Sequence, residues 1–352
     1  MPARMTSRTA PAWTTLALAG ALFVCGCGDE PRTASTDGAS REARLREIED
    51  ASDAIERLIQ ARRAREAELL VRKLLAAVPA ERREARLAEL AARTLFARAQ
   101  LDAAELPKAE RETLVREAAL FAREAARAAP DATRLRFAAL LAGQSGDAAV
   151  ATQLYDEALA FAPDDQQTLL FAAGASLAAR DAARARPLVA RHAEIAPDDA
   201  WSAGLEAQLA LLDGDAKRAV ERASEAMARD RELLEVRVLL ATALVADGRA
   251  SDAARLLAAL PAETRAKTPI AGALARALAT SGDLASAAQA WEDARRANPA
   301  DAVVRAEAAI ALLRAGDRAR AAALLDGFES LVDGVRERRR VEEEIRAAAP
   351  VR

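Results

Sequence analysis

Residues 200–233 read AWSAGLEAQLALLDGDAKRAVERASEAMARDREL, and residues 234–267 read LEVRVLLATALVADGRASDAARLLAALPAETRAK. Each segment holds two stretches with apolar residues at helical spacing, and the two stretches are separated at Gly214 and at Gly248. This pattern predicts a helix, a turn and a second helix. A Gly at the break can adopt the left-handed conformation that ends the first helix.

The same break recurs along the chain at a fixed period. Gly-Asp pairs at 146–147, 214–215, 282–283 and 316–317 are separated by 34 or 68 residues, and Arg180-Asp181 takes the place of the missing pair. Six segments of 34 residues therefore start at 132, 166, 200, 234, 268 and 302, and we number them repeats 1 to 6. A fixed period of this length predicts one continuous solenoid rather than two separate globular domains.

Two positions in the repeat are always alanine. Small side chains at both positions would let the paired helices approach closely. Position 8 is Ala139, Ala173, Ala207, Ala241, Ala275 and Ala309, and position 20 is Ala151, Ala185, Ala219, Ala253, Ala287 and Ala321. Position 24 is mostly larger, as at Tyr155 and Trp291, which we expect in the core.

Composition agrees with a helical chain and offers little for chemistry. Alanine makes up 98 of the 352 residues, whereas Gly, Pro and aromatic residues are scarce, which argues against an all-β or collagen-like chain. The net charge of −3 gives no reason to expect nucleic-acid binding. One His and two Cys leave almost no residues for a metal site or a catalytic triad. We therefore predict a chain that is not an enzyme and needs no cofactor or metal.

The period of 34, the alanines at positions 8 and 20, the large residue at position 24 and Pro at position 32 resemble the tetratricopeptide repeat family. The resemblance covers 132–335 and implies an all-α solenoid, or superhelix, of helix–turn–helix repeats. His192, Leu260 and Phe328 depart from the pattern because they occupy position 27, which is usually small. The 35-residue helical repeats that read RNA are a rival, but the unbroken spacing of 34 and the acidic balance speak against them.

The first residues of the chain look like an export signal. Arg4 and Arg8 precede an apolar stretch, 12–24, that is too short to span a bilayer. The segment LFVCGC that ends at Cys27 resembles the lipobox of bacterial lipoproteins. The resemblance implies removal of residues 1–26 and lipidation of Cys27, which would hold the chain at a membrane of the cell envelope, facing the periplasm. The alternative is an ordinary cleaved signal with two incidental cysteines.

The segments that flank the six repeats also have expected roles. Residues 27–40 are small and polar and predict a flexible tether. Residues 41–131 predict divergent helical repeats, with one helix pair at about 45–79 and another at about 82–103 and 108–129. Residues 336–352 predict a capping helix in which Arg338, Arg339 and Arg340 pair with the acidic residues four positions later.

Proteins that resemble this repeat bind ligands in a concave groove lined by positions 2, 5, 9 and 12 of the first helices. Trp201 would be an aromatic anchor there if it is exposed, or it packs against the neighbouring repeat. Gly174, Gly204 and Gly272 would admit a ligand backbone or have no role. The groove residues mapped onto this chain include Arg136, Leu140, Gln167, Leu170, Trp201, Gln208, Leu211, Glu235, Val238, Thr242 and Arg276.

These features together predict a membrane-anchored scaffold of the bacterial cell envelope that binds a protein or peptide partner in the groove. The resemblance to repeat lipoproteins suggests envelope assembly, secretion, pilus formation or polysaccharide export. The alternative is an envelope enzyme, or a regulatory subunit of one, that acts on peptidoglycan or glycans and has its catalytic module within 41–131. We expect a packing role for His192, the only histidine.

Overall fold

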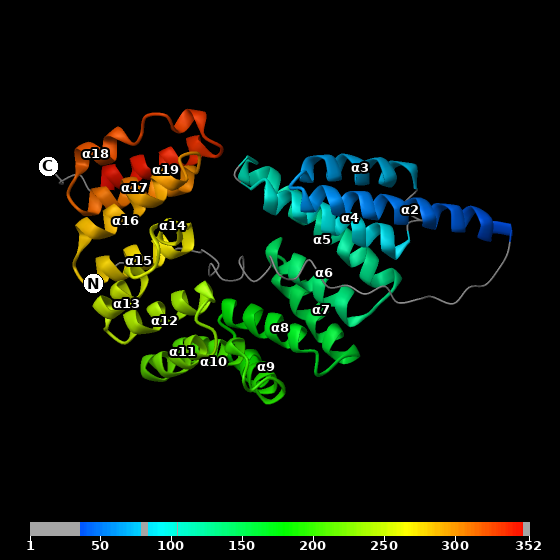
Figure 1. Ribbon diagram of the computed structural model, residues 1–352, viewed down its shortest axis with the longest axis horizontal. Coiled ribbons are helices and arrows are strands. Elements are labelled where there is room, and N and C mark those ends of the chain that lie inside the picture. Colours follow the sequence, from blue (N-terminus) through cyan, green and yellow to red (C-terminus); the bar gives the residue numbers. More distant parts are fainter. Residues whose placement is uncertain (1–35, 79–83, 104, 348–352) are drawn as a thin grey trace. The chain divides into compact units, whose positions relative to one another are not determined.

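The computed structural model describes residues 36–78, 84–103 and 105–347. Within these ranges the regular structure is entirely helical, with eighteen α-helices and one short 3-10 helix (Figure 1). The predicted all-α fold class is confirmed. The predicted signal segment 1–26 and Cys27 lie outside the described residues.

The helices are distributed over two compact units, one that ends at Ala175 and one that begins at Ser176. The boundary falls inside α8, the first helix of repeat 2. The N-terminal unit contains α2 (Thr36–Gln60), α3 (Ala64–Ala77), α4 (Ala85–Leu101), α5 (Lys108–Ala128), α6 (Ala132–Gln144), α7 (Ala148–Phe161) and most of α8 (Gln166–Ala178).

The C-terminal unit holds the remaining helices. None of the described helices of the chain is both long enough and apolar enough to cross a bilayer. The helices of this unit are α9 (Ala182–Ile195), α10 (Ala200–Asp213), α11 (Ala216–Arg229), α12 (Leu234–Ala246), α13 (Ala250–Ala258), α14 (Ala262–Arg265), α15 (Thr268–Thr280), α16 (Leu284–Ala297), α17 (Ala302–Arg314), α18 (Arg318–Ala323), the 3-10 helix η2 (Phe328–Ser330) and α19 (Gly334–Ala347).

The first helices of the six repeats start at residues 132, 166, 200, 234, 268 and 302, the starts that the period predicts. Upstream of them, α2 and α3 form one packed pair and α4 and α5 another. Helix α2 begins at Thr36, inside the range expected to be a tether. Extending a helix by a few residues costs far less than nucleating one, so the helical body continues past the predicted boundary.

The invariant alanines lie where the helices touch. All twelve alanines at positions 8 and 20 are buried, and none is more than 5% exposed. In repeats 3 and 4, Ala207, Ala219, Ala241 and Ala253 belong to a single buried cluster. Because interiors are close-packed, a larger side chain at these positions would have to push two helices apart.

The turn between the paired helices has the predicted left-handed residue. Gly214 has a φ of +82°, and the equivalent glycines of repeats 1, 4, 5 and 6 also have positive φ. In repeat 2 the same conformation is adopted by Arg180, with a φ of +59°, although this conformation strains a residue that has a Cβ atom. In five of the six repeats an aspartate then caps the second helix, as where Asp215 accepts a hydrogen bond from the Arg218 N–H, whereas Arg249 precedes α13 in repeat 4 and makes no side-chain cap.

Two of the second helices are broken, contrary to the prediction of two full helices in each repeat. In repeat 4, α13 ends after nine residues and Pro261 precedes the four-residue α14. In repeat 6, α18 has six residues, and Gly327, with a φ of +83°, precedes η2. Proline cannot continue a helix because it lacks an N–H, and a left-handed glycine ends one.

Helix α19 packs against α17 in the C-terminal unit. Its Val341 is fully buried beside Phe328 and Ile310. Arg338 pairs with Glu342 at 2.9 Å as predicted. Arg340 instead reaches Glu307 of α17 at 2.5 Å, so its charge holds the cap to the preceding repeat rather than pairing four residues along the helix.

Candidate partner-binding surface

The predicted groove residues of repeats 3 and 4 lie on α10 and α12, which pack against each other. Positions 2, 5, 9 and 12 are three or four residues apart and therefore share one face of each helix. We call this the first-helix face of α10 and α12. Its members are mostly half-buried: Trp201, Gln208 and Leu211 on α10, and Glu235, Val238, Thr242 and Val245 on α12.

Two polar groups on this face have no partner among the described residues. The Oε1 atom of Gln208 is buried and accepts no hydrogen bond. The carboxylate of Glu235 is half-buried and makes no ion pair within the described part of the chain. Thr242 is satisfied internally, since its hydroxyl donates to the Val238 carbonyl at 2.8 Å. The face therefore offers a negative charge at Glu235 among apolar side chains, and the unpaired Gln208 Oε1 lies beneath its surface.

The predicted groove residues of the N-terminal unit are less available. Arg136 is mostly buried, and its guanidinium lies 2.5 Å from the Asp165 carboxylate, which also caps α8 by accepting from the Thr168 N–H. Leu140 packs against the core of this unit. Gln167 is exposed and Leu170 is half-buried. Arg136 thus ties the first helix of repeat 1 to the residue that caps α8, a role that its position in the repeat did not reveal.

The helical glycines have different surroundings. A Cβ atom at Gly272 would lie 3.4 Å from the ring of Trp291, so this glycine makes room for the tryptophan of the paired helix. A Cβ atom at Gly204 would meet Leu239 at an ordinary 3.8 Å, and one at Gly174 would meet nothing within 4 Å. The structure thus gives Gly272 a packing reason that sequence reasoning missed. In the same repeat, Arg276 is exposed on α15.

His192 is a buried structural residue. Its side chain is fully buried, and its Nδ1 atom lies 2.8 Å from the Ser202 hydroxyl, which donates to the Ala196 carbonyl at 2.6 Å. Because the serine proton is used by that carbonyl, the imidazole donates from Nδ1, and its buried Nε2 atom has no partner. Burial lowers the pKa of His192, although nearby Asp199 raises it. The ring joins α9 to α10 and has no access to a substrate.

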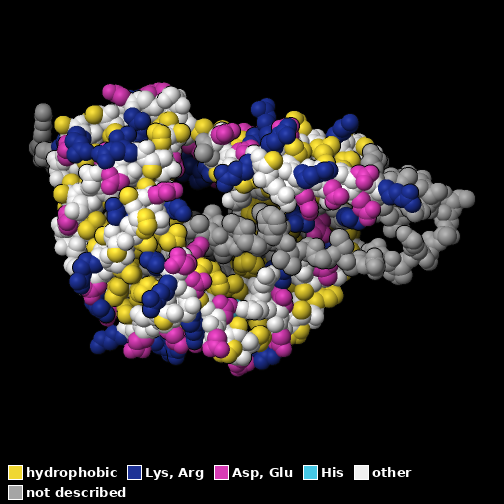
Figure 2. Space-filling view, viewed as in Figure 1, with side chains coloured by type: hydrophobic (Ala, Val, Ile, Leu, Met, Phe, Trp, Pro, Cys, Tyr) yellow, Lys and Arg dark blue, Asp and Glu magenta, His cyan; other side chains and the backbone are white. Residues whose placement is uncertain are grey.

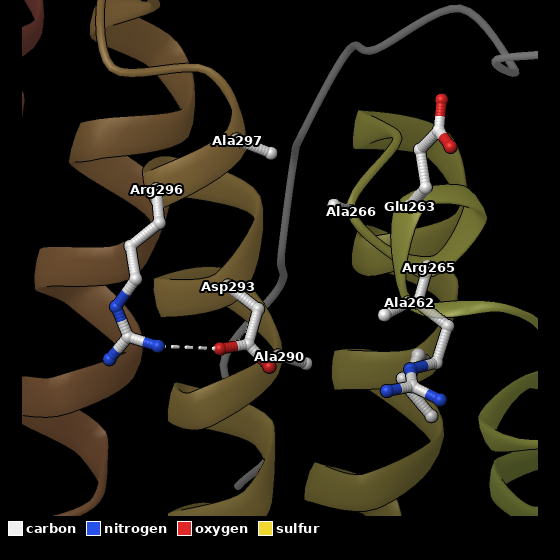
Figure 3. Close-up of a pocket in the computed structure, with 9 residues that line it drawn as sticks. Ala262, Glu263, Arg265, Ala266, Ala290, Asp293, Arg296 and Ala297 are labelled. Carbon is white, nitrogen blue, oxygen red and sulfur yellow. Dashed lines mark hydrogen bonds and ion pairs between the residues drawn. The ribbon is translucent and has the colours of Figure 1, made fainter.

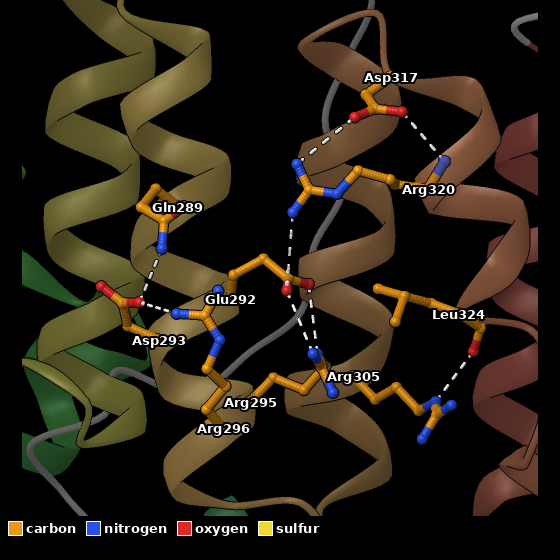
Figure 4. Close-up of polar contacts among 9 residues, drawn as sticks. All are labelled: Gln289, Glu292, Asp293, Arg295, Arg296, Arg305, Asp317, Arg320 and Leu324. Atoms are coloured by element: carbon orange, nitrogen blue, oxygen red, sulfur yellow. Dashed lines mark hydrogen bonds and ion pairs between the residues drawn. The ribbon is translucent and has the colours of Figure 1, made fainter.

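Glu292 is a buried carboxylate that the sequence analysis did not single out. Figure 4 shows it between arginines from three helices. Arg295 donates to both of its oxygens at 3.2 Å, and Arg320 approaches to 3.8 Å. Nearby Arg305 donates to the Leu324 carbonyl at 2.9 Å, and burial lowers its pKa, as does Arg295. Both Glu292 oxygens are engaged, so the cluster joins α16, α17 and α18 and leaves no carboxylate free for acid–base work.

A pocket of about 480 Å³ lies outside the predicted groove, in the C-terminal unit (Figure 3). It opens where α13 is interrupted, between α14 and α16. The sequence analysis missed it because it treated repeat 4 as regular, although Pro261 inside the expected second helix was the signal. Its lining residues are Ala262, Glu263, Arg265, Ala266, Leu274, Ala290, Asp293, Arg296 and Ala297.

No metal centre is indicated by the described residues, which contain no group of three or more His, Cys, Asp or Glu side chains placed to hold an ion.

In sequence, residues 210–277 match a family model described as the tetratricopeptide repeat, over a stretch two periods long. No curated protein matches the chain.

Solved structures share the fold at low identity. A tetratricopeptide repeat protein from Parabacteroides merdae is 13% identical over 75% of this chain and 98% of its own, with a TM-score of 0.56. Yeast Tom70 is 16% identical over 96% of this chain and 69% of its own, with a TM-score of 0.61. From the period, the buried alanines, the packed helix pairs and these similarities, the chain is an all-α solenoid of tetratricopeptide-like helix–turn–helix repeats.

Proposed function

We propose that this chain is a scaffold that binds a protein partner on the first-helix face of α10 and α12. The observation that carries the proposal is the half-buried first-helix face, on which the Glu235 carboxylate has no ion-pair partner among the described residues and accompanies apolar Leu211 and Val238. A bound segment that fits this face needs apolar side chains and a basic group for Glu235. An amphipathic helix or an extended peptide supplies both.

The experiment places a photo-crosslinking residue at Val238 in the full-length chain in intact cells. A discrete cross-linked protein is expected, and Glu235→Lys should lower its yield because the substitution reverses the charge on the face. The matched control carries the same crosslinker at Val335, which is 65% exposed on α19. The same products at both positions would contradict a specific partner on this face.

We further propose that lipid on Cys27 anchors the scaffold in the bacterial cell envelope, where it faces the periplasm and serves envelope assembly, secretion, pilus formation or polysaccharide export. The support is the lipobox-like segment that ends at Cys27 and follows an apolar stretch with a basic start. Labelled lipid should be incorporated by the parent chain and by Cys25→Ser, and lost in Cys27→Ser. Label retained in Cys27→Ser would overturn the anchor.

The envelope-enzyme alternative needs a catalytic module within 41–131. The described part of that range forms two packed helix pairs joined by ion pairs. Arg72 of α3, for example, bonds both Glu68 at 2.7 Å and Glu117 of α5 at 2.7 Å. Arg98 of α4 likewise reaches Glu68 of α3, at 3.4 Å. These ion pairs hold the helices of residues 41–131 together. The described residues of this range therefore have a packing role, and the scaffold remains the better-supported function.

A further inference from the structure

The second helices α3 and α5 of the N-terminal unit carry an excess of positive charge. Residues 61–77 and 108–128 together contain ten Lys or Arg and six Glu residues, a net charge of +4, although the whole chain has a net charge of −3. Glu110 is the one exposed acid of these ranges without an ion pair among the described residues. The exposed basic side chains without such an ion pair are Arg62, Arg65, Lys73, Arg116 and Arg127.

A leucine lies at the centre of the exposed side of each of these helices. Leu69 of α3 is 63% exposed, and Leu120 of α5 is 64% exposed. Arg65 and Lys73 are four residues before and after Leu69, and Arg116 is four residues before Leu120. Residues four apart share one face of a helix, so each leucine is flanked by basic side chains.

The two leucines belong to one surface. Arg72, three residues after Leu69, pairs at 2.7 Å with Glu117, three residues before Leu120, and so joins α3 to α5 between them. In Figure 2, dark blue side chains gather over α3 at the top of the view, with yellow apolar side chains between them. The next second helix, α7, contains two acids and no Lys or Arg, so the surface ends at α5. We call it the basic face, with the members Arg62, Arg65, Leu69, Lys73, Arg116, Leu120 and Arg127.

The proposed anchor would keep the basic face close to a bilayer. Nine residues, 27–35, precede the start of α2 at Thr36. Nine residues span at most about 30 Å, so the start of α2 stays within about that distance of the lipid. Helix α3 packs against α2, whose 25 residues rise by about 37 Å. The basic face is thus held beside the bilayer, where even a weak attraction acts at a high effective concentration.

We propose that the basic face docks on an anionic bilayer surface, so that the lipid on Cys27 anchors the chain and the face fixes its orientation. Lys and Arg side chains contact the lipid phosphates, and Leu69 and Leu120 enter the boundary between headgroups and acyl chains. A soluble acidic protein would match the charges, but the short tether favours the bilayer. The inference rests on the proposed anchor and is independent of partner binding at the first-helix face.

The test uses the lipidated chain, purified from membranes and reconstituted into vesicles. The only cysteines of the chain are Cys25, which processing would remove, and Cys27, which lipid would block, so Leu69→Cys offers a single thiol for the dye NBD. A lipid-attached quencher should reach this dye at least about threefold more in vesicles of phosphatidylglycerol and phosphatidylcholine than in phosphatidylcholine alone. The control is Val335→Cys, 65% exposed on α19, where the two lipids should give equal quenching.

Charge reversal then tests the face itself, with the dye moved to Leu120→Cys. Arg65→Glu with Lys73→Glu should lower the quenching in anionic vesicles at least about threefold, as should about 1 M salt, which shortens the screening length to about 3 Å. The matched control is Lys217→Glu with Arg218→Glu, because these residues of α11 are also exposed and have no ion pair among the described residues. It should leave the quenching unchanged.

The possible failures can be told apart. A chain that floats with both kinds of vesicle but shows equal quenching in them, or is unaffected by Arg65→Glu with Lys73→Glu, would overturn the docking and leave the anchor standing. A chain that floats with neither would overturn the anchor and the docking together. Shielding of the dye by soluble polyglutamate, without shielding by anionic vesicles, would assign the face to an acidic protein and overturn the proposal.

Discussion

Helices α16 and α13 are both second helices of the C-terminal unit, yet α16 runs for 14 residues and α13 for nine. Both follow a left-handed glycine. Position 27 is Ala294 in α16, whereas in repeat 4 it is Leu260, and Pro261 follows it. Both side chains are buried. The comparison shows that α13 ends early in the repeat that combines a bulky residue at this contact with Pro261, which cannot continue the helix.

The other repeats refine the comparison. In repeats 3 and 5 an alanine at position 27 packs against a valine at position 3 of the next repeat, as with Ala226 and Val236. In repeat 2 the larger side chain is at position 27 and the smaller one is at position 3 of the next repeat. There His192 faces Ser202, and α9 keeps its full 14 residues. In these three repeats, a side chain of larger size at one of the two positions is matched by a smaller one at the other, and the second helix stays intact.

The largest expected effect on the free energy of unfolding is in repeat 6, whose second helix α18 has only six residues. Phe328, at position 27 of repeat 6, is fully buried between α17 and α19. Phe328→Ala should lower the free energy of unfolding by about 3–5 kcal/mol and expose α19 to hydrogen exchange. Phe161→Ala is the matched control, because Phe161 is 59% exposed, and it should cost less than about 0.5 kcal/mol. Equal losses in the two variants in urea unfolding would contradict this account.

The exchange of volume can be tested in a regular repeat. Ala226→His alone should overpack the contact with Val236 and lower the free energy of unfolding by about 1–3 kcal/mol. The double variant Ala226→His with Val236→Ser recreates the pair seen in repeat 2 and should recover about 1 kcal/mol or more of that loss. A double-mutant cycle in urea measures the coupling. Strictly additive losses would show that volume is not shared between the two positions.

The buried imidazole of His192, which packs against Ser202, should make the free energy of unfolding depend on pH. Burial lowers the pKa of His192 in the folded state, so below about pH 6.5 the unfolded chain binds more protons than the folded one. The free energy of unfolding should therefore fall as the pH drops through that range, by at most about 1.4 kcal/mol per pH unit. Urea unfolding at about pH 7.5 and 5.5 measures the change. His192→Gln should flatten the dependence, since the chain has no other histidine.

The smallest expected effect concerns the turn before α9. Arg180 adopts a φ of +59°, which costs a residue with a Cβ atom about 1–2 kcal/mol, whereas glycine tolerates it but loses more entropy on folding. Arg180→Gly should thus raise the free energy of unfolding by about 0.5–1 kcal/mol. Gly214→Arg is the reverse substitution at the equivalent position of repeat 3, where φ is +82°, and it should lower the free energy of unfolding. A destabilising Arg180→Gly would show that the arginine side chain contributes more than the strain.

The sequence was sufficient for the features that repeat. The invariant alanines and the Gly-Asp turns set where helices start and touch, and the structure places Ala139 and Ala151, for example, in buried contacts. It was not sufficient where the outcome depends on a contact between two particular side chains that are distant in the sequence. His192 and Ser202 are ten residues apart and lie in different repeats, and Arg136 and Asp165 are 29 residues apart within repeat 1, so the helical spacing reveals neither pair.

The surface was predicted less completely than the fold. The positions of Gln208 and Glu235 followed from the family resemblance, but whether their polar atoms have partners depends on neighbouring helices. The pocket was missed for a related reason. Its walls come from residues that are unremarkable one by one, and it exists only because Pro261 ends the regular pattern early.

Helix α19 also bears on how such a chain can grow. It lies against α17, with Val341 and Phe328 in the contact and Arg340 tied to Glu307. A further 34-residue segment added after α17 would need that same apolar surface, and a second copy of the protein would need it in order to stack end to end. Helix α19 therefore occupies the surface on which another repeat would stack against α17.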